Sequence, residues 1–264
     1  MITEILHFIA SFFETFNAIS VALAVLFGVI WMACFRPPLF SKFWLWAILP
    51  FGAMITLLAV AVIQLPFESW LGHEAHVTSQ GEHNIMPLLL AALPLIVISA
   101  LVQEGGKLIP AVTYWQLEKR KISPVLGMQI GAVAGAGFGI LQAQWTHNAI
   151  FASGWTFEMV QIEGVGELFV FYESVFIVAM HVTTAALSGY GLAKGWGWQF
   201  YLLASLIHIG MYVVSFLIHI HVIPHVMGEL ALSIYIEAIM VVVIIIGERS
   251  AKREEHDEVK QTEQ

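Results

Sequence analysis

Charged residues are scarce in this sequence of 264 residues: they make up 11% of it, whereas hydrophobic residues make up 59%. A soluble domain carries about 25% charged residues, so this chain has too little polar surface to cover a soluble core. The high apolar content also excludes a disordered chain, because disordered chains are poor in apolar residues. The composition therefore predicts a membrane protein.

Cysteine is nearly absent as well. The single cysteine, Cys34, excludes a disulfide framework and any zinc or redox site built on paired cysteines. Basic residues are outnumbered, with 11 Lys+Arg against 19 Asp+Glu and a formal net charge of −8. This balance argues against nucleic acid as a partner.

Long apolar stretches dominate what remains. A membrane-spanning helix needs roughly 20 apolar residues to cross about 30 Å of hydrocarbon, and seven stretches qualify. They predict an all-α polytopic membrane protein of about seven transmembrane helices. The expected spans are approximately 19–35, 43–65, 86–115, 124–145, 168–193, 198–218 and 229–247.

The distribution of lysine and arginine predicts the orientation of these helices. The connections 66–86, 146–167 and 219–228 contain no lysine or arginine, whereas the alternate connections and the C-terminal segment are basic. Because basic loops stay in the cytoplasm, we expect the N-terminus outside and the C-terminus inside. Residues 1–247 are expected to form one membrane domain, followed by a charged cytoplasmic tail at 248–264.

A few ionisable residues lie inside the expected spans, where each costs several kcal/mol unless paired. Glu104 and Lys107 share one helix face at i, i+3 spacing, and His181 and His208 occupy two later spans at comparable depth. A structural ion pair with packing histidines is one interpretation; a shared polar cavity with a function is the other.

Glycines recur every fourth residue in the expected span 124–145, which predicts close helix packing. Gln142 and Gln144, at its outer end, are expected to point into the same cavity. Histidines of the outer loops have spacings that suit a metal site on a helix, against the alternative of a solvated acidic loop. These pairs are His73 with His76, and His221 with His225.

Four segments in spans three to six resemble the PrsW-type intramembrane proteases, within the wider group of CAAX-processing and bacteriocin-processing membrane proteases. The matching core covers residues 103–216. The segments are QEGGKLIP (103–110), GAGFGILQAQW (135–145), AMHVTTAALSGYGLAKG (179–195) and SLIHIGMYVVSF (205–216).

The chain departs from the family pattern at four positions, one of which is Ala143 in place of the asparagine of the FGxxEN motif. Gln103 stands where the family has the first of two adjacent glutamates, and Gln142 stands where it has the glutamate of its FGxxEN motif. Tyr212 replaces an asparagine that follows the last histidine. These departures raise the alternative of a catalytically inactive relative that acts as a membrane binding or assembly subunit.

The resemblance implies an intramembrane peptidase of the glutamic type. Glu104 would be the general base that activates a water, and His181 and His208 would hold the water or polarise the scissile carbonyl. Gln103, Lys107, Gln142 and Tyr212 would support the site. No cofactor is expected; Glu104, His181 and His208 could together supply three metal ligands, so metal dependence stays open.

The partners implied are the lipid bilayer and a membrane-associated protein or peptide substrate, with a homo-oligomer or membrane complex left open. The expected location is a prokaryotic plasma membrane. Two further classes are a haem protein with His181 and His208 as axial ligands, and a transporter whose proton path uses Glu104, Glu173 and Glu237.

Overall fold

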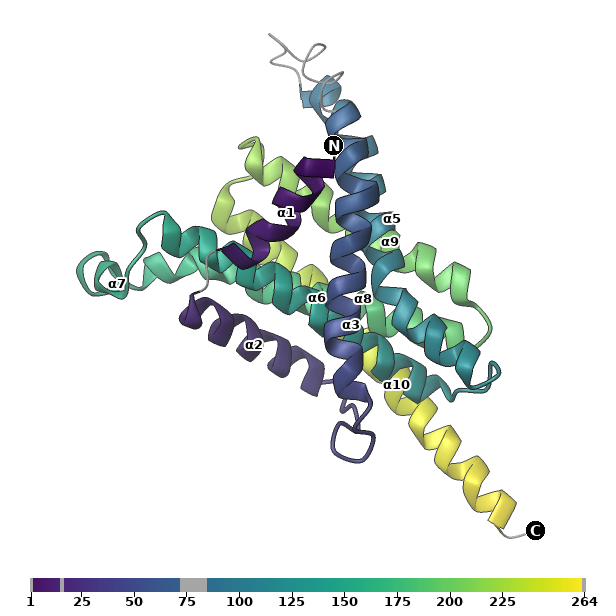
Figure 1. Ribbon diagram of the computed structural model, residues 1–264. Helices are drawn as coiled ribbons and strands as arrows, with labels where there is room; N and C mark the ends of the chain where they lie inside the picture. The colour runs from purple at the N-terminus through teal and green to yellow at the C-terminus, as the bar shows by residue number, and fades with distance from the viewer. Residues whose placement is uncertain (1, 15–16, 72–84, 263–264) are drawn as a thin grey trace.

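The computed structural model describes residues 2–14, 17–71 and 85–262 (Figure 1). Within these residues the chain is helical and contains no strand, so the expected all-α polytopic fold is confirmed. The elements are α1 (Ile2–Glu14), α2 (Ala18–Ala33), α3 (Leu45–Ala59), η1 (Val60–Gln64), α5 (Ile85–Leu117), α6 (Pro124–Ala152), α7 (Phe157–Glu163), η2 (Val165–Phe171), α8 (Tyr172–Ala193), α9 (Gly197–His219) and α10 (His225–Thr262).

Six helices in the described part of the chain are long and apolar enough to cross a membrane, and they match the last six expected spans. They are Leu45–Leu71, Ile85–Leu117, Pro124–Ala152, Val165–Ala193, Gly197–His219 and His225–Asp257. The first expected span corresponds to α2, which has only 16 residues. A seventh crossing would require α1 and α2 to act together as one bent pair.

Helix α6 lies at the centre of the bundle and packs against α2, α3 and α8. Its glycines make this possible, because a Cβ on Gly131 would lie 2.0 Å from the carbonyl oxygen of Ala185 on α8. A Cβ on Gly135 would lie 2.2 Å from the carbonyl oxygen of His181. The predicted close packing of this glycine stripe is confirmed, and it brings the backbone of α8 against α6.

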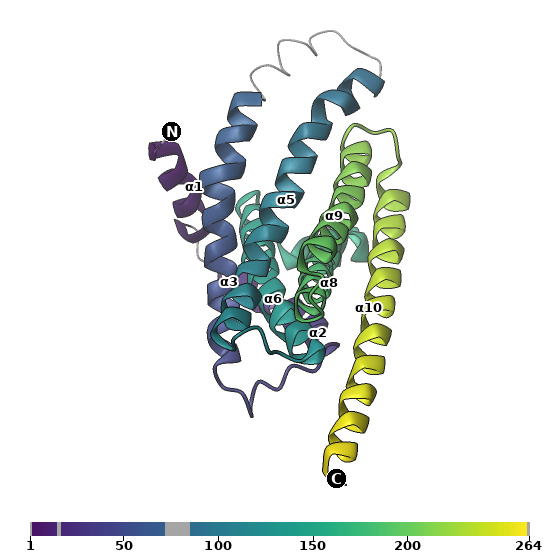
Figure 2. The ribbon, with the colours of Figure 1, turned by 90° about the vertical axis from the view of Figure 1, so that its right-hand side faces the viewer.

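The connection between α2 and α3 and the C-terminus lie at one end of the bundle, and the turn between α9 and α10 lies at the other (Figure 2). The basic segments that contain Arg36 and Lys252 thus share an end, as the predicted orientation requires; which end faces the cytoplasm stays a prediction. The charged tail continues α10 as a helix to Thr262. In this part of α10, the carboxylate of Glu254 accepts a hydrogen bond from the backbone N–H of Val125, in the first turn of α6.

The helix Leu45–Leu71 contains a π-helical turn at η1, where the backbone N–H of Leu65 donates to the carbonyl of Val60. Pro66 follows immediately, and a proline inside a helix has no N–H and collides with the preceding turn. A widened turn is one way in which a helix accommodates this local conflict. It sets the direction of Gln64 and of the residues after it.

Candidate functional site

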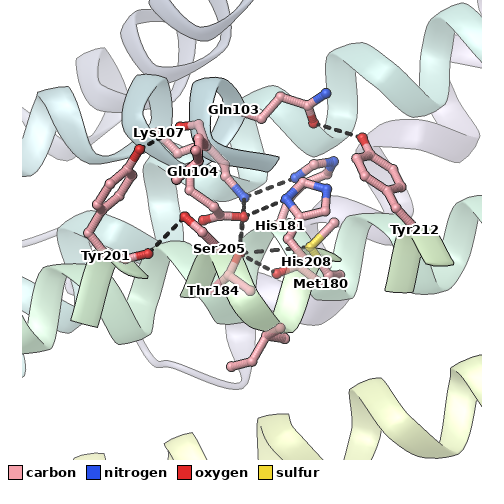
Figure 3. A network of polar contacts seen from close by, with 12 residues as sticks. Gln103, Glu104, Lys107, Met180, His181, Thr184, Tyr201, Ser205, His208 and Tyr212 are labelled. Atoms are coloured by element: carbon pink, nitrogen blue, oxygen red, sulfur yellow. Dashed lines mark hydrogen bonds and ion pairs between the residues drawn. The ribbon is translucent and has the colours of Figure 1, made fainter. Parts of the chain in front are cut away.

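A buried polar cluster lies between α5, α8 and α9 (Figure 3). Helix α5 contributes Glu104 and Lys107, α8 contributes His181 and Thr184, and α9 contributes His208; all five have side chains that are fully or almost fully inaccessible to solvent. Nitrogen and oxygen atoms of Glu104, His181 and His208 lie within 4.8 Å of one another. The expected proximity of these three residues is therefore confirmed, while their catalytic role stays a prediction.

One carboxylate oxygen of Glu104 is the centre of the cluster. Its Oε1 atom lies 2.6 Å from Nζ of Lys107, 2.7 Å from Nδ1 of His208 and 3.0 Å from Oγ1 of Thr184. The hydroxyl of Thr184 has a single proton, which goes either to this oxygen or to the backbone carbonyl of Met180 at 2.9 Å. Ammonium and imidazole donors around a carboxylate form the strong class of hydrogen bonds.

The ammonium of Lys107 has three protons and three acceptors. Besides Glu104, its Nζ lies 2.9 Å from Oγ1 of Thr184 and 3.0 Å from Nδ1 of His181. An ammonium can only donate, so Nδ1 of His181 accepts and its other nitrogen, Nε2, carries the proton. That Nε2 lies 2.8 Å from Oε1 of Gln142, which accepts. The contacts thus define His181 as a neutral imidazole with both nitrogens in use.

His208 differs from His181 in its free nitrogen. Its Nδ1–H donates to Glu104, whereas its Nε2 is buried without a hydrogen-bond partner among the described residues. Oε2 of Glu104 is also buried and unpartnered there. Buried polar atoms without partners are uncommon, and each requires an explanation such as a bound water, an ion or a catalytic role.

A metal ion fits this cluster poorly, although three potential ligands lie close together. Lys107 already holds the position between Glu104 and His181, at 2.6 Å and 3.0 Å from their respective atoms. A cation there would have to displace an ammonium of the same sign. The imidazoles of His181 and His208 are edge to face with centroids 5.4 Å apart, which leaves no room for the porphyrin that axial haem ligands hold between them.

The three polar residues that depart from the family pattern, Gln103, Gln142 and Tyr212, all make hydrogen bonds at or beside the cluster. Gln142 accepts from His181, and the hydroxyl of Tyr212 donates to Oε1 of Gln103 at 3.1 Å. The ring of Tyr212 also packs against His208, with centroids 4.5 Å apart. Gln103 and Tyr212 thus form a pair between helices α5 and α9.

Two expectations for other polar residues were wrong. Gln144 points away from the cluster and donates to the backbone carbonyl of Phe12 at 3.3 Å. Glu237 is exposed on α10, so it cannot share a buried path with Glu104, and the expected transport route loses one of its three members. In the outer loops, His221 and His225 are exposed, and His73 and His76 lie outside the described residues.

Two polar residues next to the cluster, Gln64 and Glu68, are not among the residues predicted from the sequence. Gln64 accepts a hydrogen bond from Nε2 of Gln103 at 3.1 Å, and its own Nε2 donates to Glu68 at 2.8 Å. Their i, i+4 spacing would have placed them on one helix face. Glu68 was instead assigned to the outer loop because Pro66 suggested that the helix ended before it.

Compared with known proteins, the chain matches no family model, no curated protein and no solved structure. The fold and the contacts of the polar cluster are therefore the basis for any statement on function. They define the class of the molecule as an integral membrane protein with an ionisable cluster buried in its helical bundle.

Proposed function

We propose that this protein is an intramembrane peptidase in which Glu104 and His208 activate a water molecule. The observation that supports this function is the pair of free acceptors, Oε2 of Glu104 and Nε2 of His208, on two residues joined by a 2.7 Å hydrogen bond. A water supplies the donors that both atoms lack. Peptide hydrolysis needs such a positioned base to remove a proton from the attacking water.

The remaining residues of the cluster position this pair. Oε2 of Glu104 takes the proton of the water, while Lys107 and Thr184 hold Oε1 of the same carboxylate. The imidazole of His208 is oriented by Glu104 and presents its free Nε2 to the water. His181 is a positioning residue, because both of its nitrogens are used by Lys107 and Gln142. The resemblance of residues 103–216 to the PrsW-type proteases agrees with these roles.

The substrate of such a site is a peptide bond of a membrane-associated protein or peptide that reaches the cluster from the side of the bundle. The proposed location is a prokaryotic plasma membrane. No residue of the proposed mechanism requires a cofactor. Tyr212 lies between the cluster and an open cavity, since it contacts His208 and also lines that cavity, so a substrate that approaches from this cavity reaches Glu104 only when Tyr212 moves aside.

The test compares the new N- and C-termini of membrane proteins in cells that produce different variants. Mass spectrometry of terminal peptides identifies these termini. Wild type should generate ends that are missing with Glu104→Gln and with His208→Gln. Glu173→Gln is the matched control, because it changes a membrane glutamate outside the cluster and should retain all of these ends. Identical ends in wild type and Glu104→Gln would refute proteolysis.

A second candidate function rests on the complete burial of the cluster. Glu104, Lys107, His181 and His208 all have 0% exposure, which suits an ion-pair network that fixes helix packing in a catalytically inactive membrane subunit. In that case Glu104→Gln lowers stability and leaves the protein ends unchanged. The same experiment therefore separates the two candidates.

A further inference from the structure

An open cavity of about 400 Å³ lies beside the buried cluster, between the helix Leu45–Leu71, α5 and α9. These three helices stand in that order across the bundle (Figure 2). Polar groups and apolar side chains share its lining. The polar ones are Gln64, Glu68, Ser99, Tyr212, Ser215 and His219.

Among the described residues, Glu68 supplies the only carboxylate of this lining. Its Oε1 accepts hydrogen bonds from Nε2 of Gln64 at 2.8 Å and from Oγ of Ser99 at 2.9 Å. These two donors are neutral, so they orient the carboxylate without supplying a positive charge. No lysine or arginine in the described part of the chain forms an ion pair with Glu68, and the connection 66–86 contains neither residue type.

The other walls of the cavity suit the aliphatic part of a long basic side chain. Leu95 and Ile96 line it from α5, and Phe216 lines it from α9. Lysine and arginine bury their methylene groups along apolar surfaces and keep the charged end in a polar site. An oriented carboxylate next to such walls is therefore complementary to a cationic nitrogen on a mainly apolar chain.

Two hydrogen bonds and one ring contact connect this cavity to the proposed catalytic pair. Gln64 accepts from Gln103, and Gln103 accepts from Tyr212. Tyr212 lines the cavity and packs its ring against His208. A peptide that fills this cavity would thus reach Tyr212, whose ring lies against His208.

We propose that this cavity is a substrate subsite for a cationic group of a peptide, and that Glu68 is the residue that selects it. The inference rests on the proposed function for its meaning, since the bound peptide is the substrate of the Glu104–His208 pair. Lysine and arginine side chains and a free α-amino group share the required chemistry. Glu68 acts on substrate preference and takes no part in activating the water.

Binding of defined peptides to the purified protein in detergent tests the proposal without any turnover. The probes are three fluorescent apolar peptides of equal length, compared by anisotropy. One has a single lysine and a blocked N-terminus, the second replaces the lysine with norleucine, and the third has norleucine with a free α-amine. Wild type should bind the lysine peptide or the free-amine peptide roughly tenfold or more tightly than the blocked norleucine peptide, since a hydrogen bond to a charged group is worth this much.

Glu68→Gln should remove that preference while it keeps the binding of the norleucine peptide, because the amide has the same shape and no charge. Glu173→Gln, which changes a carboxylate outside the cavity, should preserve the preference. Equal binding of all three peptides by wild type, or an unchanged preference in Glu68→Gln, would overturn the subsite. Thermal unfolding of both variants shows that they are folded.

The outcome is independent of the test for proteolysis. Glu104→Gln should retain the lysine preference in the binding experiment although it generates no protein ends. Loss of the preference in Glu68→Gln with no proteolysis in wild type would leave the subsite intact and refute the peptidase. Proteolysis in wild type with an unchanged lysine preference in Glu68→Gln would refute the subsite alone.

Discussion

The buried cluster can be divided into two halves that each contain one histidine and that differ in how completely their polar atoms are paired. In the inner half, Lys107, His181 and Gln142 use every polar atom that they direct into the cluster. In the outer half, Glu104 and His208 each keep one buried acceptor free. Two histidines with equal burial and a 5.4 Å centroid distance thus have different roles. Hydrogen-bond saturation, more than burial, separates a scaffold residue from a candidate reactive one.

The largest expected effect comes from removing the ammonium of Lys107, which contacts Glu104 in one half and His181 in the other. Lys107→Met should lower the free energy of unfolding by about 3–5 kcal/mol, because it leaves Glu104 as an uncompensated buried charge. Thermal unfolding in detergent measures this loss. The double variant Glu104→Gln with Lys107→Met should recover much of it; a double variant less stable than Lys107→Met would contradict the pairing.

Two variants, His208→Leu and His181→Leu, test whether the two histidines have different roles. His208→Leu should reduce turnover of a processed membrane protein by about 10²–10⁴-fold, the usual contribution of a residue in acid–base catalysis. His181→Leu should cost more stability than His208→Leu, because Lys107 and Gln142 both lose a partner. Rates from terminal-peptide quantification and unfolding curves of both variants check this. A larger stability loss for His208→Leu would reverse the assignment of the two roles.

The smallest effect is expected at Gln142. Gln142→Met removes the acceptor of the Nε2–H of His181 and should lower the free energy of unfolding by about 1–3 kcal/mol, the cost of an unsatisfied buried donor. It leaves every contact of Glu104 and His208 in place. Chemical or thermal unfolding measures the loss, with Gln144→Met as the control, since the side chain of Gln144 donates its hydrogen bond to Phe12 of α1, away from the cluster. Equal losses in both variants would mean that the bond to His181 contributes nothing.

The spans and the depth of the polar residues could be predicted from the sequence because both follow from hydropathy and residue counting. Comparable depth allowed Glu104, His181 and His208 to share a cavity, and the family resemblance grouped them as one site. The hydrogen-bond partners could not be predicted, because they depend on the rotation of each helix about its axis, and a helix that is apolar on all sides gives little sign of that rotation. Gln142 and Gln144 show this: two residues apart, one meets His181 and the other meets α1.

Local irregularity accounts for the remaining differences. Glu68 was assigned to a loop because Pro66 was taken to end the helix, whereas the π-helical turn before the proline lets the helix continue to Leu71. The first expected span was counted from its apolar run, but α2 ends at Ala33, before Arg36 and its positive φ of 48°. The hydropathy of a sequence predicts neither a π-helical turn nor a residue with left-handed backbone conformation.

The widened turn at Val60–Gln64 divides its helix into two segments with different angular phase. In a regular helix each residue advances by about 100° around the axis, so one surplus residue in a turn rotates everything beyond it. Deleting a single residue there would restore a regular turn and carry Glu68 off the cavity wall, while α3 itself keeps its contacts with α6. The position of a carboxylate relative to the buried cluster thus depends on the number of residues in this turn as well as on which side chains it contains.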